Sequence, residues 1–170
     1  MSARARWRPA YVAIGSNLAD PVAQVTRAQK TLETLPDSGW FVHSGLWRSA
    51  PLGPADQPDF VNACTGFLTT LGPHDLLARL KAFEREAGRT PGEHWGPRPL
   101  DLDLVALGSL VIDEAGLTLP HPRAAERNFV LLPLSEIAPG LVVPGRGSVA
   151  RLLGAVSRTE PRIERIGRGA

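Results

Sequence analysis

The sequence predicts an α/β (α+β) fold in which an antiparallel sheet has helices packed on one face. Runs of β-forming residues and amphipathic helical runs follow one another in the order βαββαβ. The chain has 170 residues, a usual length for one domain, and 43% of them are hydrophobic, which is enough for a core. This element order is that of a ferredoxin-like sandwich, here with additional pieces at the C-terminal end.

The first half of the chain predicts a strand, a helix and two further strands. A short buried strand at 10–14 ends at the turn residues Gly-Ser-Asn. Asp20 and Pro21 are favoured residue types for a helix N-cap and the first helical position, and apolar residues follow at helical spacing. Runs rich in β-forming residues predict strands at 40–49 and 60–70, separated by a proline-rich loop.

The second half predicts a helix, a strand, a hairpin and a mostly helical segment. Apolar residues at helical spacing follow Pro73, and Gly88 is a residue type that ends helices. Leucines and aspartates that alternate at 100–104, followed by an apolar run to 107, predict the fourth strand of the sheet. We expect a hairpin at 108–122 and a mostly helical segment at 124–139.

Composition limits the class of protein. The net charge is only +2, and all 19 basic residues except Lys30 and Lys81 are arginines, which bind phosphate and carboxylate groups in a bidentate manner. Cys64 is the single cysteine, so a disulfide framework and a cysteine metal site are excluded, in keeping with a reducing compartment.

We expect one domain over residues 1–170, with frayed termini at 1–9 and 158–170. No apolar run reaches the roughly 18 residues that span a bilayer, and the start lacks the apolar stretch of a signal peptide. We therefore expect a cytoplasmic protein with no membrane partner, and we expect it to be a monomer.

Asp101 and Asp103 alternate with leucines in the fourth predicted strand. Because side chains alternate along a strand, the leucines face the helices and both carboxylates face the open side of the sheet. Their α-carbons are expected roughly 6.6 Å apart, so both carboxylates can reach metals about 3.5–4 Å apart. Oxygen ligands of this kind favour Mg²⁺ completed by substrate phosphates. The alternative is a solvent-facing strand with salt bridges.

Basic residues near the aspartates in sequence suit a phosphate site. Arg89 and Arg98 precede the aspartates, while His121 and Arg127 follow them. Carboxylates that hold Mg²⁺ beside arginines that hold phosphate oxygens form the arrangement that phosphoryl transfer requires. The alternative is that each arginine, taken singly, is a solvated surface residue.

The third predicted strand carries Phe60 and Asn62 on one face. A ring beside an amide can bind a flat heterocycle by stacking and by edge hydrogen bonds, with Phe129 a candidate for the opposite side. The alternative is that both phenylalanines are ordinary core residues. Motifs of P-loop, Rossmann and serine hydrolase sites are absent from the sequence.

Four blocks of the chain resemble the 6-hydroxymethyl-7,8-dihydropterin pyrophosphokinase family. They read YVAIGSNL, APLGPADQPDFVNA, WGPRPLDLDLVALG and LPHPRAAERNFVLLPLSEIAP, and the resemblance runs in order from about Tyr11 to Pro144. The family works in folate biosynthesis on a ferredoxin-like fold. It transfers pyrophosphate from ATP to the hydroxymethyl group of a reduced pterin and releases AMP. The resemblance implies ATP and 6-hydroxymethyl-7,8-dihydropterin as substrates and two Mg²⁺ ions as cofactors.

The resemblance also implies roles for individual residues. Asp101 and Asp103 become magnesium ligands and, with the phosphate clamps Arg89 and Arg98, the catalytic residues. The ATP-binding positions are Arg89, Trp95, Arg98, Leu104, Thr118, His121 and Arg127. The pterin-binding positions are Ser49, Ala50, Leu52, Phe60, Asn62 and Phe129. Glu84 matches a position that is usually acidic near the site.

The chain departs from the family pattern at three places. Phe60 stands where many members have tyrosine, Pro91 where the loop often has a second arginine, and Pro122 where an aromatic or similar residue often follows the histidine. Two rival functions are a ferredoxin-like RNA-binding module and a D-x-D hydrolase or sugar-nucleotide transferase. Only 6% of residues are aromatic and the fourth strand exposes two carboxylates, so no nucleic acid partner is expected.

Overall fold

A computed structural model describes residues 5–88, 99–156 and 160–170. In these residues a six-stranded antiparallel sheet has the strand order β10-β3-β4-β1-β5, and β2 also pairs with β4. The strands of this sheet are β1 (Arg8–Ser16), β2 (Ser38–His43), β3 (Leu46–Ser49), β4 (Phe60–Thr69), β5 (Asp101–Leu107) and β10 (Ile163–Gly167). The predicted antiparallel sheet is confirmed.

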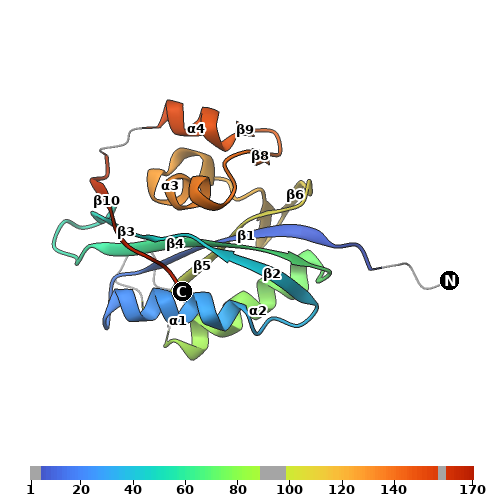
Figure 1. The fold of residues 1–170 in the computed structure, drawn as a ribbon, viewed down its shortest axis with the longest axis horizontal. Coiled ribbons are helices and arrows are strands. Elements are labelled where there is room, and N and C mark those ends of the chain that lie inside the picture. Colours follow the sequence, from blue (N-terminus) through green and yellow to red (C-terminus); the bar gives the residue numbers. More distant parts are fainter. Residues whose placement is uncertain (1–4, 89–98, 157–159) are drawn as a thin grey trace.

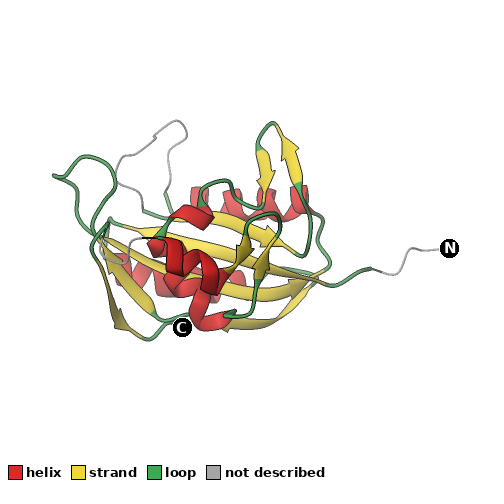
Figure 2. Cartoon of the chain, turned by 90° about the horizontal axis from the view of Figure 1, so that it is seen from above, coloured by secondary structure: helices red, strands yellow, loops and turns green. Residues whose placement is uncertain are grey.

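Helices cover both faces of the sheet (Figure 1). On one face lie α1 (Pro21–Leu32) and α2 (Pro73–Glu86), as predicted for the two helices of a βαββαβ unit. The C-terminal additions cover the other face with α3 (Asn128–Ile137) and α4 (Val149–Ala155), and Figure 2 shows the sheet from that side. The remaining elements are η1 (Ala124–Glu126) and two hairpins, β6 (Ile112–Glu114) with β7 (Leu117–Leu119) and β8 (Val142–Val143) with β9 (Gly147–Ser148).

The main core lies between the sheet and the helix pair α1 and α2. Alternate residues of β1, such as Val12 and Ile14, are buried there, as the period of two along a strand requires. Helix α1 begins as predicted, because the Oδ1 atom of Asp20 accepts a hydrogen bond from Ala23 N–H at 3.2 Å and Pro21 follows. In the described residues, no helix is long and apolar enough to cross a membrane.

The single strand predicted at 40–49 is interrupted, so that β2 and β3 each pair with part of β4. At the interruption Ser44 N–H donates to Cys64 O at 2.9 Å, and Ser44 Oγ accepts from Cys64 N–H at 2.8 Å. The next residue is Gly45, where a Cβ atom would lie 2.7 Å from Gly167 O. The C-terminal segment therefore packs closely against the chain at this interruption.

The prediction of frayed termini is wrong for the described part of the C-terminal end and for Arg8 and Pro9. Residues 163–167 form β10, which pairs with β3, and Ala170 N–H donates to Gln29 Oε1 at 2.7 Å. Arg8 and Pro9 lie in β1. The alternating charges of the C-terminal segment indicated a solvated tail, but an edge strand with one exposed face has the same pattern.

Candidate active site

The floor of the site is a row of three residues on neighbouring strands. Gly15 of β1 pairs with Asn62 of β4 on one side and with Asp101 of β5 on the other. Because neighbouring strands lie about 4.8 Å apart, the α-carbons of Asn62 and Asp101 are about 10 Å apart, with no side chain between them. A Cβ atom on Gly15 would lie 3.6 Å from Asn62 Oδ1 and 3.9 Å from Phe60 Cδ1, so Gly15 faces the same side as both. This is the face that carries α3.

The two aspartates lie on that face because the leucine between them is buried on the other. Leu102 belongs to the core beneath α1 and α2. Its N–H donates to Oε1 of Glu84 at 2.8 Å, and Glu84 Oε2 lies 3.5 Å from Lys81 Nζ. The side chain of Glu84 is only 2% exposed, so a buried carboxylate of α2 holds the outer edge of β5 between the aspartates.

Negative charge accumulates around Asp103. Burial, followed by the like charges of Asp101 and Glu84, raises the pKa of Asp103 to about 7. A bound cation would offset this repulsion. The described residues contain no group of three or more His, Cys, Asp or Glu side chains that could hold a metal. The donor set of two carboxylates therefore fits a hard cation such as Mg²⁺ that takes its remaining oxygens from substrate and water.

His121 reaches the site through an irregularity in β5. Leu104 pairs with Val12 and Ala106 with Tyr11, so Val105 forms a bulge, and its carbonyl accepts from His121 N–H at 2.8 Å.

The ring of His121 faces an aspartate, and its pKa is lowered by its surroundings. Arg123 N–H donates to its Nδ1 at 3.2 Å, which leaves the proton of the neutral ring on Nε2, 3.9 Å from Asp103 Oδ2. Burial and the positive charge of Arg127 lower the pKa of His121. The imidazole thus presents an N–H donor beside Asp103.

A cavity of about 270 Å³ lies next to the aspartates and gathers most of the described residues predicted to bind ATP. Its walls come from α2, β5, β7 and the segment after β7, and they include Lys81 with its ammonium group. The lining residues are Leu77, Lys81, Leu102, Asp103, Leu104, Gly116, Leu117, Thr118, His121 and Pro122. The structure therefore brings Leu104, Thr118 and His121 together beside Asp103.

Two predicted residues lie together at the start of α3. The guanidinium carbon of Arg127 lies 5.6 Å from the centroid of the Phe129 ring, a cation–π contact. Helix α3 packs on β4, which carries Phe60 and Asn62. The predicted aromatic residues thus reach the same face of the sheet from two different elements.

Hydrogen bonds fix several of the other predicted pterin-binding residues in β3 and β4 and just after β3. Asn62 Nδ2 donates to Ser49 Oγ at 2.8 Å and to Trp47 O at 3.3 Å, which orients the buried amide. Ala50 N–H already donates to Arg162 O at 2.9 Å, so this N–H is occupied by the protein itself. Leu52 lies in the loop before β4 and is half exposed.

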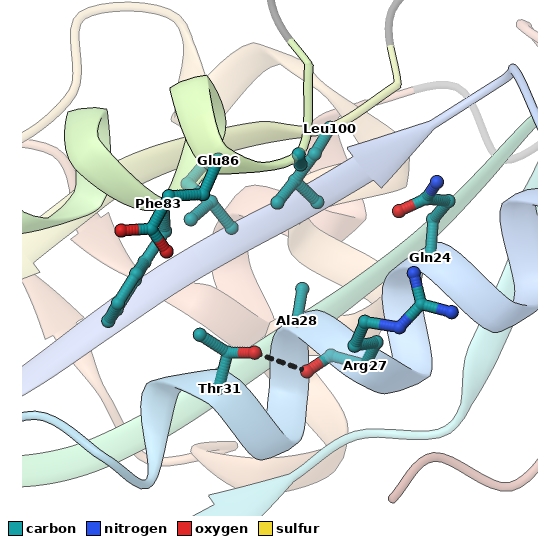
Figure 3. A pocket seen from close by; sticks show the side chains of 9 residues that line it. Gln24, Arg27, Ala28, Thr31, Phe83, Glu86 and Leu100 are labelled. Carbon is teal, nitrogen blue, oxygen red and sulfur yellow. Dashed lines mark hydrogen bonds between the residues drawn. The ribbon is translucent and has the colours of Figure 1, made fainter.

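A second hollow of about 260 Å³ lies between α1 and α2, on the opposite face of the sheet (Figure 3). Apolar side chains such as Phe83 and Leu100 line it together with polar ones such as Gln24 and Arg27. None of the residues predicted to act in catalysis or binding lines this hollow, although Leu102 borders both this hollow and the cavity beside Asp103.

Arg89, Trp95 and Arg98 lie outside the described residues. Conversely, the sequence reasoning missed Gly15 and Lys81. Gly15 was interpreted as a turn residue, although a glycine next to a strand pattern is also a signal for close approach of a ligand. Lys81 stands three residues before Glu84 on one helix face, a spacing that would have indicated the ion pair.

Comparison with known proteins shows one consistent group of relatives. Residues 11–139 match the family described as 7,8-dihydro-6-hydroxymethylpterin-pyrophosphokinase (HPPK). A 2-amino-4-hydroxy-6-hydroxymethyldihydropteridine pyrophosphokinase of Pseudomonas aeruginosa is 46% identical over 145 residues, covering 85% of this chain and 90% of the relative. The enzyme of the same name from Haemophilus influenzae is 42% identical over 144 residues, with the same two coverages.

Solved structures agree with these relatives in fold. Wild-type HPPK-DHPS of Plasmodium falciparum, crystallised with pteroate, superposes with a TM-score of 0.68 at 14% identity and covers 98% of this chain. The chain spans only 49% of the length of that protein. At this identity the similarity supports the ferredoxin-like fold alone.

Proposed function

Because the chain belongs to the 7,8-dihydro-6-hydroxymethylpterin-pyrophosphokinase family, we propose that the row formed by Asn62, Gly15 and Asp101 is the place of its reaction. The chain is an ATP-dependent diphosphotransferase of folate biosynthesis. It transfers pyrophosphate from ATP to the hydroxymethyl group of 6-hydroxymethyl-7,8-dihydropterin and yields the pterin diphosphate and AMP.

The pterin lies over Gly15, at the Asn62 end of the row. Asn62 reads the edge of the heterocycle, and Ser49 keeps its amide in the orientation required for this. Phe60 and Phe129 provide aromatic surfaces for the flat ring from β4 and α3. The missing side chain at Gly15 leaves room for the hydroxymethyl group to point along the row toward Asp101.

ATP occupies the cavity on the other side of the aspartates. Leu104 and Thr118 line it, and the Nε2–H group of His121 is available to donate to a phosphate oxygen. Arg127 adds positive charge from the start of α3, and Lys81 adds it from α2. The triphosphate would then extend from this cavity toward the pterin.

The reaction is an in-line attack of the pterin hydroxyl oxygen on the β-phosphorus of ATP, with AMP as the leaving group. The chain's contribution is mainly to hold the two substrates in line, which is worth about 7–11 kcal/mol of barrier when the alignment is good. In this proposal Arg89 and Arg98 contact the phosphates, and Trp95 belongs to a loop over the site. These three roles rest on the sequence resemblance alone.

Asp101 and Asp103 are the residues that would hold Mg²⁺, in the number of two that the resemblance implies. Bound Mg²⁺ supplies charge neutralisation on the transferred phosphates. The raised pKa of Asp103 supports this assignment, because burial and the like charges of Asp101 and Glu84 disfavour the charged carboxylate, and a bound cation would offset both. The single domain over residues 1–170, the monomeric state and the cytoplasmic location remain predictions.

The test is the formation of AMP by the purified chain with ATP, Mg²⁺ and 6-hydroxymethyl-7,8-dihydropterin. We expect AMP to appear only with the pterin, in equal amount to pterin diphosphate and without free pyrophosphate. Asp101→Asn should abolish the signal, while Asp113→Asn, an exposed change in β6, should leave it intact. AMP formation without the pterin would contradict the proposed reaction.

A further inference from the structure

We propose that the C-terminal tie, defined as Pro161, Arg162 and Ile163, positions the pterin-binding residues, and that Asn128 is the positioning residue through which it acts on α3. This inference rests on the proposed function, because it takes the pterin pocket to be formed by β3, β4 and the start of α3. It concerns a segment that the sequence pattern had indicated to be frayed.

The C-terminal tie contacts each of the three segments that carry a pterin-binding residue. Pro161 O accepts from Asn128 Nδ2 at 2.9 Å, and Asn128 directly precedes Phe129. Ile163 pairs with Ser49 in the β10–β3 ladder.

The middle residue of the C-terminal tie adds two contacts. Arg162 O accepts from Ala50 N–H at 2.9 Å, and Arg162 Nη2 lies 3.2 Å from Asp59 Oδ2, next to Phe60. Three successive residues therefore link β3, the entry to β4 and the start of α3.

Burial decides which of these contacts matters most. Asn128 is only 1% exposed and its hydrogen bond to Pro161 is partly buried, so losing the donor would leave a partly buried carbonyl without this partner. The Arg162–Asp59 ion pair has side chains that are 63% and 31% exposed, and exposed pairs of this kind contribute little. We therefore expect a large effect at Asn128 and a small one at Arg162.

Helix α3 is also held at its other end by the same part of the sheet. Glu136 accepts hydrogen bonds from Gly45 N–H at 3.2 Å and from the indole N–H of Trp47, and it lies 3.5 Å from Arg165 Nη2 of β10. Because these contacts fix the C-terminal end of α3, loss of the Asn128 hydrogen bond should loosen mainly the first turn of the helix. Phe129 lies in that turn.

The position of the C-terminal tie in the sheet predicts which substrate is affected. β10 and β5 form opposite edges of the strand order β10-β3-β4-β1-β5. The cavity assigned to ATP is built on the β5 edge, whereas Ser49, Asn62 and Phe60 lie on β3 and β4 near β10. Of the described residues assigned to ATP, only Arg127 adjoins Asn128, whereas Leu104, Thr118 and His121 line the cavity on the β5 edge. Weakening the C-terminal tie should therefore raise the KM for the pterin more than the KM for ATP.

Asn128→Asp tests this, because it keeps the size of the side chain and replaces the donor to Pro161 O with a carboxylate oxygen. We expect the pterin KM to rise about tenfold, with kcat and the ATP KM changed less than threefold. A tenfold change corresponds to about 1.4 kcal/mol. Glu164→Gln is the matched control, since this exposed residue of β10 pairs only with Arg48 on the neighbouring strand in the contacts described, and its kinetics should match the unmodified chain.

A second pair of variants keeps the test decisive if Asn128→Asp does not fold. Arg162→Ala, an exposed change, should raise the pterin KM two- to threefold, and Arg162→Lys should restore it. An unchanged pterin KM, or an equal change in both KM values, would overturn the inference. Absence of pterin-dependent AMP formation in the unmodified chain would instead refute the proposed function, so the two failures are distinguishable.

Discussion

Asp103→Asn should stabilise the chain at alkaline pH while it abolishes activity. The side chain is 31% exposed and lies among Asp101, Glu84 and His121, and its pKa is raised from the ordinary 3.8 to about 7. Between these two values the folded chain keeps a proton that the unfolded chain has lost. The stability contributed by protonated Asp103 is therefore fully present below pH 3.8 and is lost as the pH rises through about 7.

The size of the effect follows from the same values. The shift of the Asp103 pKa from 3.8 to about 7 limits the loss in free energy of unfolding to about 4 kcal/mol, because each pKa unit corresponds to about 1.4 kcal/mol. Because a third of the carboxylate is exposed to screening water, we expect about 1–2 kcal/mol at pH 8. For a domain of this size, that corresponds to a rise in Tm of roughly 3–6 °C. Asparagine keeps the shape of the side chain and lacks the charge that causes the loss.

The assay is thermal unfolding followed by circular dichroism at pH 5 and pH 8, with EDTA present to exclude divalent cations. The Tm advantage of Asp103→Asn should be larger at pH 8 than at pH 5, while pterin-dependent AMP formation falls by at least about 100-fold. Asp113→Asn removes a negative charge from an exposed position of β6 and should show no such pH-dependent gain. An equal Tm difference at both pH values, or a lower Tm for the variant at pH 8, would refute the reasoning.

Three further predictions concern the floor, the edge of β5 and the metal. Gly15→Leu should raise the pterin KM at least tenfold, because its side chain would fill the space between Asn62 and Asp101. Gly15→Ala, with its Cβ 3.6 Å from Asn62 Oδ1, should change the pterin KM little. A normal pterin KM for Gly15→Leu would argue against this row as the floor of the site. Glu84→Leu should lower the free energy of unfolding, measured in urea, by about 1–3 kcal/mol, because Leu102 N–H loses its buried acceptor. An unchanged free energy of unfolding would show that this hydrogen bond does not stabilise the fold. EDTA should reduce AMP formation to background and added Mg²⁺ should restore it; activity that persists in EDTA would remove the metal role of the aspartates.

The alternation in β5 made the faces of its side chains predictable. Leucines and aspartates that alternate along a strand must point to opposite faces, and Leu102 is indeed in the core while Asp103 lies at the cavity. The bulge at Val105, which brings His121 beside Asp103, left no such signal. A bulge depends on the pairing of two strands, so a pattern within one strand does not reveal it.

The C-terminal segment shows the opposite case, in which a local pattern led to a wrong expectation. Its charges indicated a frayed tail, yet Ile163 pairs with Ser49 and Pro161 accepts from Asn128. The partners lie far away in the sequence, and β3 presents an edge that only this segment covers in the described sheet. Long-range hydrogen bonds therefore decided the structure of a segment whose own residues predict solvent exposure.

By itself the sequence determined the order of the elements in the βαββαβ unit and the faces to which the leucines and aspartates of β5 point, because steric alternation and helical periodicity act between near neighbours in the chain. Only the tertiary structure decided that Gly15 lies between Asn62 and Asp101, that Glu84 supports the edge of β5, and that α3 and α4 cover the second face of the sheet. These features arise from strand register and from packing between distant segments. There the free energy of folding depends on which two segments meet, and the residue pattern within one segment does not reveal the other.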